Sequence, residues 1–428
     1  MKKVSALIIA LLMLIPAFAA LPVSAAEEYD YNDYITDIEE TVIEIDGLTE
    51  KYDFLHITDS HAVVLSSNTS SAYYSHSVQR YNQFATQDPT SNGYPAKDTL
   101  AAMYAYADDP ANGIDCVMLT GDNIDFPTSE NVSFITNLVN GASVDHLYCF
   151  GNHDWTFPDN YFTAQGRSAY RPMLTSAMGG NNLVGYRDYG AFVAVTIDNS
   201  ENYIYYSAVA DFIRNTIVPM NKPVLLFCHV PFYNSALLAY SKSVWGTDET
   251  MASPSNTKYP YNAATKYIYE WATTNANVKA IFAGHFHINH EGYTGRTPIY
   301  LTASGYSGTM RHIVVKPTDC AVHTWTDEEI ITAPTWEPGL LHHTCTVCFA
   351  EEDAVIPPIC TLGSPDGDDD VDMADVLMIR RHIAGAARIT SDAVVMASDV
   401  NFDGKINAKD VLLVRKYIAG LIPSFITN

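Results

Sequence analysis

Short apolar runs that end at polar residues are the main pattern of the chain before residue 327. Five of them are rich in Val, Leu, Ile and Phe and stop at Asp, Asn or His: YDFLHITDSH, IDCVMLTGD, VDHLYCFGNHD, PVLLFCHV and VKAIFAGHFH. Such a run is typical of a buried strand that delivers polar side chains at its carboxyl end. Neighbouring strand ends of this kind are expected to form a site together.

Helical patterns occur between these strands. Helices are indicated by the segments DTLAAMYAYAD, SAVADFIRNTIV and NAATKYIYEWATTN, and further strands by FVAVTID, PIYLTASG and HIVVKP. Strands that alternate with helices early and follow one another late predict a layered α/β sandwich, with one mixed sheet or two packed sheets, over residues 42–326. Residues 26–41 are acidic and rich in Tyr, and we expect them to be a flexible lead-in.

Residues 1–25 have the three-part layout of a secretory signal peptide. Lys2 and Lys3 precede the apolar run ALIIALLMLIPAFAAL, and small residues end the segment at Ala25. The run is short for a membrane anchor, so we expect cleavage and export, to the medium or to a complex at the cell surface. Because no other apolar stretch reaches spanning length, no membrane span is expected after cleavage.

The mature chain is strongly acidic. Two of the 24 Lys and Arg residues lie in the expected signal peptide, which leaves 22 against 49 Asp and Glu and a net charge of −27. Such a surface repels polyanions, so nucleic-acid polymers and anionic membranes are poor candidates as partners. Seven cysteines are too few for a dense disulfide framework.

The polar groups at the strand ends form motifs of carboxylate and imidazole side chains. In chain order the motifs are D-S-H, G-D-N-I-D, G-N-H-D, H-V-P and G-H-F-H, and they contain Asp59, His61, Asp122, Asp125, Asn152, His153, Asp154, His229, His285 and His287. Three motifs have glycine before the polar residue, which permits a tight turn. Each motif alone is commonly structural, but the ordered set favours a metal site, and its size favours two ions with a bridging carboxylate.

In this order the motifs resemble those of the calcineurin-like metallophosphoesterase family. The resemblance implies that one ion is held by Asp59, His61, Asp122 and His287, and a second by Asp122, Asn152, His229 and His285. It also implies that His153 is the general acid, that Asp125 orients its imidazole, and that Asp154 assists. The divalent ions, which would be Fe, Zn or Mn, would activate a hydroxide for attack on a phosphomonoester or phosphodiester.

Differences from related phosphatases at the motif positions narrow the range of expected substrates. Phosphoprotein phosphatases of the superfamily usually carry Arg after G-D-x-x-D and again soon after G-N-H, whereas Phe126 and Trp155 stand here. Purple acid phosphatases have Tyr at the position of Asp125. A protein substrate and iron–tyrosinate chemistry are therefore both disfavoured. An alternative function of a different class is that the α/β domain is a non-catalytic module that binds phosphate or a glycan.

Residues 327–362 are rich in Pro, Thr, Glu and His and are interpreted as a linker or a small module. Cys345 and Cys348 have C-x-x-C spacing, and Cys360 follows them. Zinc binding with the help of His342 and His343 is one interpretation. It is the less favoured one, because only three cysteines lie in this segment.

Residues 363–428 contain an internal repeat, in which Asp375 of the first copy corresponds to Asp410 of the second. In the second copy the spacing of a calcium loop is met by Asp399, Asn401, Asp403, Lys405 through its carbonyl, Asn407 and Asp410. The first copy is less regular and offers Asp366, Asp368, Asp372 and Asp375, with Ser364 at the first ligand place and Asp369 where glycine is usual. The duplicate resembles a type I dockerin, a small all-α domain. That resemblance implies calcium binding and docking onto a cohesin of a scaffold or cell-surface complex such as a cellulosome.

Overall fold

The computed structural model describes residues 30–157, 162–177, 183–246, 262–326 and 329–425. The expected signal peptide, residues 1–25, lies outside these ranges. The chain divides into two compact units, of which the first comprises Met1–Glu40, Phe54–Arg187 and Val193–His312 and the second Thr41–Asp53, Asp188–Phe192 and Ile313–Asn428. None of the helices in the described ranges has the length and apolar character that crossing a bilayer requires.

The first sheet has five strands in the order β1-β11-β2-β3-β4. The strands are β1 Asp37–Ile45, β2 Tyr52–Ile57, β3 Cys116–Leu119, β4 Asp145–Tyr148 and β11 Thr309–Pro317. Strands β2, β3 and β4 are parallel, so their carboxyl ends lie at one edge. β1 begins at Asp37, inside the segment expected to be a flexible lead-in. The sequence pattern did not indicate this start, because the adjacent acidic residues Glu39 and Glu40 interrupt the alternation of apolar and polar residues.

The second sheet has six strands in the order β5-β6-β7-β8-β10-β9. The strands are β5 Val184–Asp188, β6 Val193–Ile197, β7 Val224–Phe227, β8 Val278–Ala283, β9 His290–Thr294 and β10 Thr297–Leu301. Strands β6, β7, β8 and β10 are parallel, and β9 pairs antiparallel at the edge. The two sheets face each other through aromatic rings: Phe227 stacks on Phe282, and His56 of the first sheet lies 6.0 Å from each.

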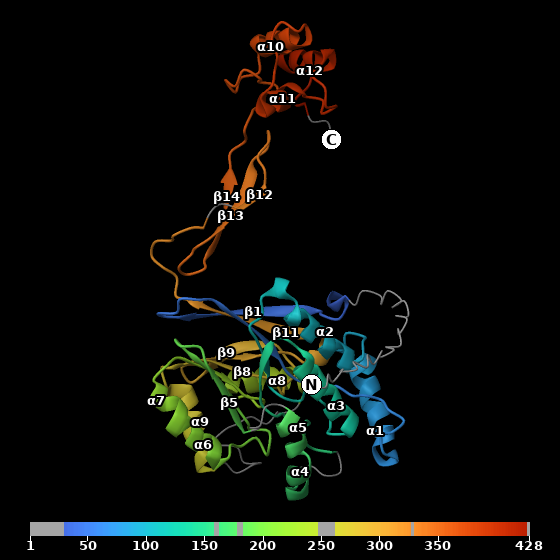
Figure 1. Ribbon diagram of the computed structural model, residues 1–428, viewed down its shortest axis with the longest axis vertical. Helices are drawn as coiled ribbons and strands as arrows, with labels where there is room; N and C mark the ends of the chain where they lie inside the picture. The colour runs from blue at the N-terminus through green and yellow to red at the C-terminus, as the bar shows by residue number, and fades with distance from the viewer. Residues whose placement is uncertain (1–29, 158–161, 178–182, 247–261, 327–328, 426–428) are drawn as a thin grey trace, which may run out of the picture. The chain divides into compact units, whose positions relative to one another are not determined.

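Helices lie around the two sheets (Figure 1). They are α1 Ser71–Asn82, α2 Ala96–Asp108, α3 Ser129–Gly141, α4 Ala164–Ala169, α5 Arg171–Ala177, α6 Ser207–Phe212, α7 Val218–Met220, α8 Ser235–Trp245 and α9 Ala263–Thr274. Met103 of α2 and Ile135 of α3 pack on the first sheet, whereas Val209 of α6 and Ile268 of α9 pack on the second. This is the layered α/β sandwich that the sequence predicted.

Residues 329–356 form a third, antiparallel sheet within the segment interpreted as a linker or small module. Its strands are β12 Glu329–Thr332, β13 Gly339–Thr344 and β14 Glu351–Ile356, with β13 in the middle. Leu341 and Cys345 are buried, while β12 is exposed along its whole length. The segment thus has its own small fold.

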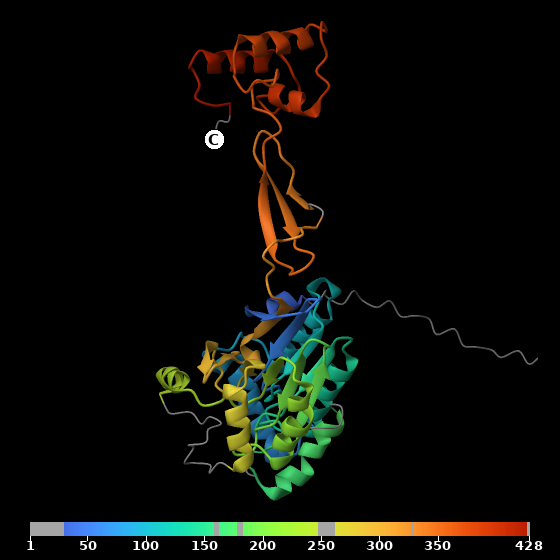
Figure 2. The same cartoon turned by 90° about the vertical axis from the view of Figure 1, so that its left-hand side faces the viewer.

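The C-terminal repeat forms an all-α domain with helices α10 Met373–Ile383, α11 Asp392–Ser398 and α12 Ala408–Ile418. Helices α10 and α12 lie side by side (Figure 2). Both begin with the same reciprocal capping arrangement, in which the side chain of the cap accepts a backbone N–H and a carboxylate three residues later accepts the N–H of the cap. The structure therefore shows the repeat as two equivalent loop–helix units.

Candidate metal centre

The five polar motifs meet beyond the carboxyl ends of β2, β3, β4, β7 and β8. Backbone hydrogen bonds join the loops that carry them. The N–H of Asp59 donates to Gly121 O at 2.9 Å and the N–H of His61 donates to Asp122 O at 2.7 Å. In the second sheet, the N–H of Gly284 donates to His229 O at 3.0 Å. The parallel strands thus place motifs from distant parts of the sequence next to one another.

Five of the predicted ligands have left-handed backbone conformations. They lie at φ values between 45° and 68° and are Asp59, His61, Asp122, His285 and His287. Non-glycine residues rarely adopt this conformation, and it persists only where the surrounding structure enforces it. Its concentration on the predicted ligands marks this place as a functional site.

The glycines of the motifs are required mainly because the loops that carry the motifs approach one another closely. The expected tight turn occurs at Gly121, where φ is 90°. Gly151 and Gly284 do not have positive φ, but a Cβ on Gly151 would lie 2.1 Å from Asp122 Oδ1, and one on Gly284 would lie 2.0 Å from Thr58 Oγ1. A side chain at either position would displace the loops that carry the ligands.

The first group of donor atoms comes from Asp59, His61 and His287, together with Asp122. Asp59 Oδ1 lies 3.2 Å from His287 Nε2, and the Nε2 atoms of His61 and His287 are 3.1 Å apart. Asp59 is fixed through its other oxygen, which accepts hydrogen bonds from the N–H of His285 at 2.7 Å and from the Thr58 hydroxyl at 2.8 Å. These three side chains present their donor atoms within a space that one ion would fill.

The second group comes from Asp122, His229 and His285. Asp122 Oδ2 lies 3.3 Å from His229 Nε2, which is 3.2 Å from His285 Nδ1. The same carboxylate oxygen is 3.8 Å from His61 Nε2 in the first group. Thr120 O lies 2.8 Å from His229 Nδ1, so that ring's Nε2 is left to face the group. Asp122 therefore lies between the two sets of donors, where a bridging ligand is needed.

Asp125 is shared by three neighbours. Its Oδ1 lies 2.9 Å from His61 Nδ1 and 3.2 Å from His153 Nδ1, and Arg80 binds both carboxylate oxygens at 2.7 Å. The sequence predicted the contact with His153, and the structure adds those with His61 and Arg80. Asp125 thus contacts a predicted ligand and the predicted acid at once.

Asp154 and Asn152 are buried in the loop after β4. One oxygen of the Asp154 carboxylate accepts the N–H of Gly151 at 2.8 Å and of Asp122 at 3.0 Å, while the other accepts the N–H of Asn123 at 2.9 Å. The carbonyl of Asn152 accepts the hydroxyl of Thr156 at 2.7 Å. The Asp154 carboxylate is thus occupied in holding the G-D-N-I loop against the G-N-H-D loop.

The electrostatic environment separates the histidines into two classes. Burial lowers the pKa of His61 to about 4 and that of His285 to about 3. Burial also acts to lower the pKa of His229 and His153, but the neighbouring carboxylates, Asp122 first among them, together outweigh it, and each pKa rises to about 9. The site therefore concentrates negative charge around Asp122, as a site for cations would.

Sequence reasoning missed several groups around the site. Arg80 extends from α1, and the following π-helix η2, Gln83–Gln87, places Phe84 in a stack on the ring of His61 with centroids 4.6 Å apart. The Tyr306 hydroxyl lies 3.2 Å from His287 Nδ1. A π-helix often marks a functional site, but nothing in the polar sequence of α1 distinguishes Arg80 from a surface residue.

The predicted calcium ligands line two matching loops. In the second loop the N–H of Gly404 donates to Asp399 Oδ2 at 2.8 Å and the amide of Asn407 donates to Lys405 O at 2.9 Å. In the first loop Asp369 has a φ of 66°, close to the 76° of Gly404 at the same place. The last acidic residue of each loop, Asp375 or Asp410, is fully buried, and burial raises its pKa.

Two family models match the chain. The model of the calcineurin-like phosphoesterases matches residues 52–289, more than half of the chain, and the model of the dockerin type I domain matches residues 365–419. Among curated proteins, no sequence matches the chain.

Solved structures of phosphoesterases show a weak likeness at 12% identity. The dimetal phosphatase from Danio rerio aligns over 72% of this chain and 98% of its own, with a TM-score of 0.39. The purple acid phosphatase from yellow lupin (Lupinus luteus) seeds aligns over 74% of this chain and 55% of its own, with a TM-score of 0.37. The phosphopantetheinyl hydrolase from Mycobacterium tuberculosis aligns over 61% and 92%, with a TM-score of 0.33. Such likeness says nothing about the substrate.

The extent of the first match decides the family. It begins at Tyr52, the first residue of β2, and ends at Asn289, just beyond G-H-F-H, so it includes all five motifs. The chain belongs to the calcineurin-like phosphoesterase family, whose members hydrolyse phosphoester bonds, and it carries a type I dockerin.

Proposed function

We propose that the two donor groups hold two divalent transition-metal ions, Fe, Zn or Mn. One ion would be held by Asp59, His61, Asp122 and His287, and the other by Asp122, Asn152, His229 and His285. The position of Asp122 between the two groups is the observation that carries this proposal. Imidazole and carboxylate donors that converge in two groups, most of them buried, are the ligands that such ions prefer.

The remaining residues donate a proton to the leaving group and orient the side chain that donates it. When bound, the two ions lower the pKa of a water molecule and neutralise charge on the phosphoryl group. His153 is about one third exposed at its side chain, so it can reach the leaving oxygen and donate a proton to it. Asp125, held by Arg80, orients the His153 ring. Asp154 does not face the substrate in this proposal and acts by positioning the loops.

The substrate is a phosphomonoester or phosphodiester of a small organic group. Phe126 and Trp155, which replace the arginines of phosphoprotein phosphatases, are 1% and 0% exposed. They belong to the core and cannot hold a phosphoprotein. Arg80 is a cation beside the site, and Trp245, whose ring centroid is 6.1 Å from that of His287, offers an aromatic surface for the organic group.

Assays with a chromogenic phosphomonoester and a chromogenic phosphodiester test this function. We expect hydrolysis of at least one of them, its loss on treatment with a chelator, and its return on adding zinc, manganese or iron. The loss should follow because the donors alone cannot acidify water. If neither ester shows chelator-sensitive turnover while phosphate or a glycan still binds, the protein is the non-catalytic binding module instead.

We further propose that the protein is exported and is tethered through its dockerin to a cohesin on a scaffold or cell-surface complex. The matching calcium loops and the paired helices α10 and α12 support this role, because dockerins bind cohesins through such a pair.

Calcium is expected to order the dockerin. Adding calcium to chelated protein should increase the helical circular dichroism signal, since the buried carboxylates Asp375 and Asp410 then gain a counter-charge. Asp399→Ala should weaken this response, whereas Asp392→Ala, on the exposed start of α11, should leave it intact. An unchanged signal on adding calcium to the wild type would contradict the assignment.

A further inference from the structure

Four side chains that bind soft metals meet beside the third sheet, far in sequence from the phosphoesterase motifs. Cys320 Sγ lies 3.4 Å from His323 Nδ1, 3.6 Å from Cys345 Sγ and 3.4 Å from Cys348 Sγ. Cys348 Sγ is 3.3 Å from His323 Nδ1. All four donor atoms lie within 4.8 Å of one another.

The two pairs of donors come from two chain segments that run antiparallel. Cys320 and His323 have C-x-x-H spacing after β11, and Cys345 and Cys348 have C-x-x-C spacing after β13. Trp325 forms a β-bridge with Cys345. The N–H of Thr326 donates to Thr344 O, and that of Thr346 donates to Thr324 O, both at 2.8 Å. Backbone pairing therefore holds the two short motifs against each other.

The distances fit a tetrahedral ion better than a disulfide. Zinc binds sulfur at about 2.3 Å and imidazole nitrogen at about 2.0–2.1 Å, so the edges of its tetrahedron are about 3.5–3.8 Å long. The contacts given above, from 3.3 to 3.6 Å, are close to these edges. A disulfide would need about 2.05 Å between two sulfurs.

The surroundings of the cluster also suit a structural ion. Cys345 and Cys348 are fully buried. The N–H of Val347 points to Cys345 Sγ at 3.5 Å, a contact that stabilises a thiolate. The Trp325 ring lies 4.7 Å from that of His323 and covers it. Three cysteines and one histidine form one of the common ligand sets of closed, structural zinc sites.

We propose that Cys320, His323, Cys345 and Cys348 hold one structural zinc ion, separate from the phosphoesterase site. The ion ties the segment after β11 to the turn between β13 and β14. It thereby stabilises a sheet that buries too few apolar side chains to be stable by itself.

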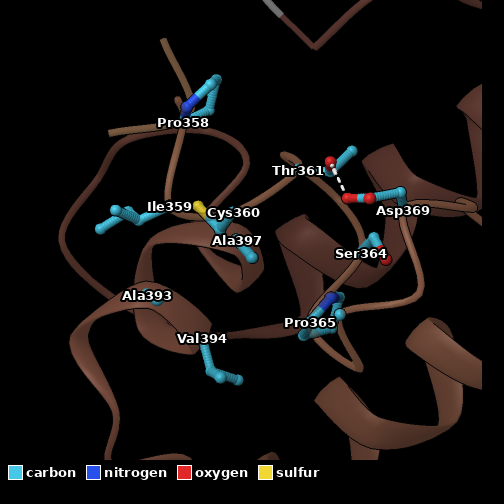
Figure 3. Close-up of a pocket in the computed structure, with 11 residues that line it drawn as sticks. Pro358, Ile359, Cys360, Thr361, Ser364, Pro365, Asp369, Ala393, Val394 and Ala397 are labelled. Atoms are coloured by element: carbon cyan, nitrogen blue, oxygen red, sulfur yellow. Dashed lines mark hydrogen bonds between the residues drawn. The ribbon is translucent and has the colours of Figure 1, made fainter. Parts of the chain in front are cut away.

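This assignment corrects the ligands considered from the sequence. His342 lies 2.7 Å from Asp353, and His343 stacks on Trp325, so neither ring joins the cluster. Cys360 lies in a different place, in a pocket beside the first calcium loop, next to Ala397 (Figure 3).

Cobalt(II) titration of the metal-free, full-length protein tests the proposal. Cobalt bound to thiolates absorbs in the near ultraviolet, and the ligands proposed for the phosphoesterase and calcium sites contain no sulfur. We expect the thiolate absorption to reach a plateau as cobalt is added, even though the phosphoesterase site also takes up cobalt, and to vanish when zinc is added. Cys348→Ser should abolish it, and the matched Cys360→Ser should not. His323→Ala should alter the band, whereas His342→Ala should leave it unchanged.

Measurements on the wild type decide the question even where a cysteine variant fails to fold. Zinc should slow the alkylation of Cys345 and Cys348 but not that of Cys360. The proposal is overturned if adding cobalt(II) to the reduced wild-type protein produces no cobalt–thiolate absorption. It is also overturned if mass spectrometry of the protein recovered after export shows a disulfide among Cys320, Cys345 and Cys348, or if His342→Ala behaves like His323→Ala.

Discussion

Asp122→Asn is expected to remove both metal and phosphoesterase activity. Asparagine tolerates the left-handed backbone at this position, where φ is 50°, so the loop should keep its shape. The amide is neutral, however, and cannot bridge two cations as a carboxylate does. Because Asp122 is a proposed direct ligand to both ions, the loss should exceed the roughly 10–100-fold that follows loss of an outer hydrogen-bond partner.

The measurements are metal content by mass spectrometry and turnover of the chromogenic esters, with thermal unfolding as a check on folding. Asp145→Asn is the matched control, since Asp145 is an exposed residue of β4 that pairs with Arg187. It should retain its metal and turnover. An Asp122→Asn protein that still bound two ions and turned over normally would remove Asp122 from the bridging position.

His153→Ala is expected to lower turnover while the metal content stays at the wild-type level. Its Nδ1 faces Asp125, and its side chain is 30% exposed, so the ring is placed to give a proton rather than to complete either donor group. Loss of a general acid typically costs about 10²–10⁴-fold in rate. The loss should be large for an alkyl ester, whose alkoxide must be protonated, and small for a nitrophenyl ester, whose phenolate leaves without help.

The dependence on the leaving group distinguishes an acid from a residue that only positions others. His146→Ala provides the control, because His146 lies in β4, away from the donor groups. It should lower the rate of neither ester. If His153→Ala lost metal, or if both esters slowed equally, His153 would be a ligand or a structural residue and not the proton donor.

The sequence predicted the parts of the site that follow directly from a strand. Each run of buried residues, such as Cys116–Leu119, identifies a strand, and parallel strands bring their ends together, so local pattern predicts that Asp59, Asp122 and His153 lie near one another, whereas their roles come from the family resemblance. The layered α/β sandwich and the dockerin helices were predicted in the same way, from apolar periodicity and from the repeat, but the choice between one mixed sheet and two packed sheets stayed open.

The groups that were missed depend on tertiary contacts that no local pattern records. Arg80 lies on a helix of polar sequence, and only the packing of α1 brings it to Asp125. Cys320 and His323 lie before residue 327, outside the segment taken as a linker, and only the pairing of Trp325 with Cys345 brings them to the C-x-x-C motif. Spacing in the sequence cannot reveal either contact.

The left-handed backbone of the five proposed ligands has a consequence for the evolution of this site. Each such residue costs roughly 1–3 kcal/mol that glycine would largely avoid. Substitutions that relax the backbone at these five positions would therefore stabilise the fold while deleting a donor atom. Selection for stability alone would therefore favour loss of the metal-binding side chains. A related chain with glycine at these positions would be expected to keep the fold but to lack the catalytic activity.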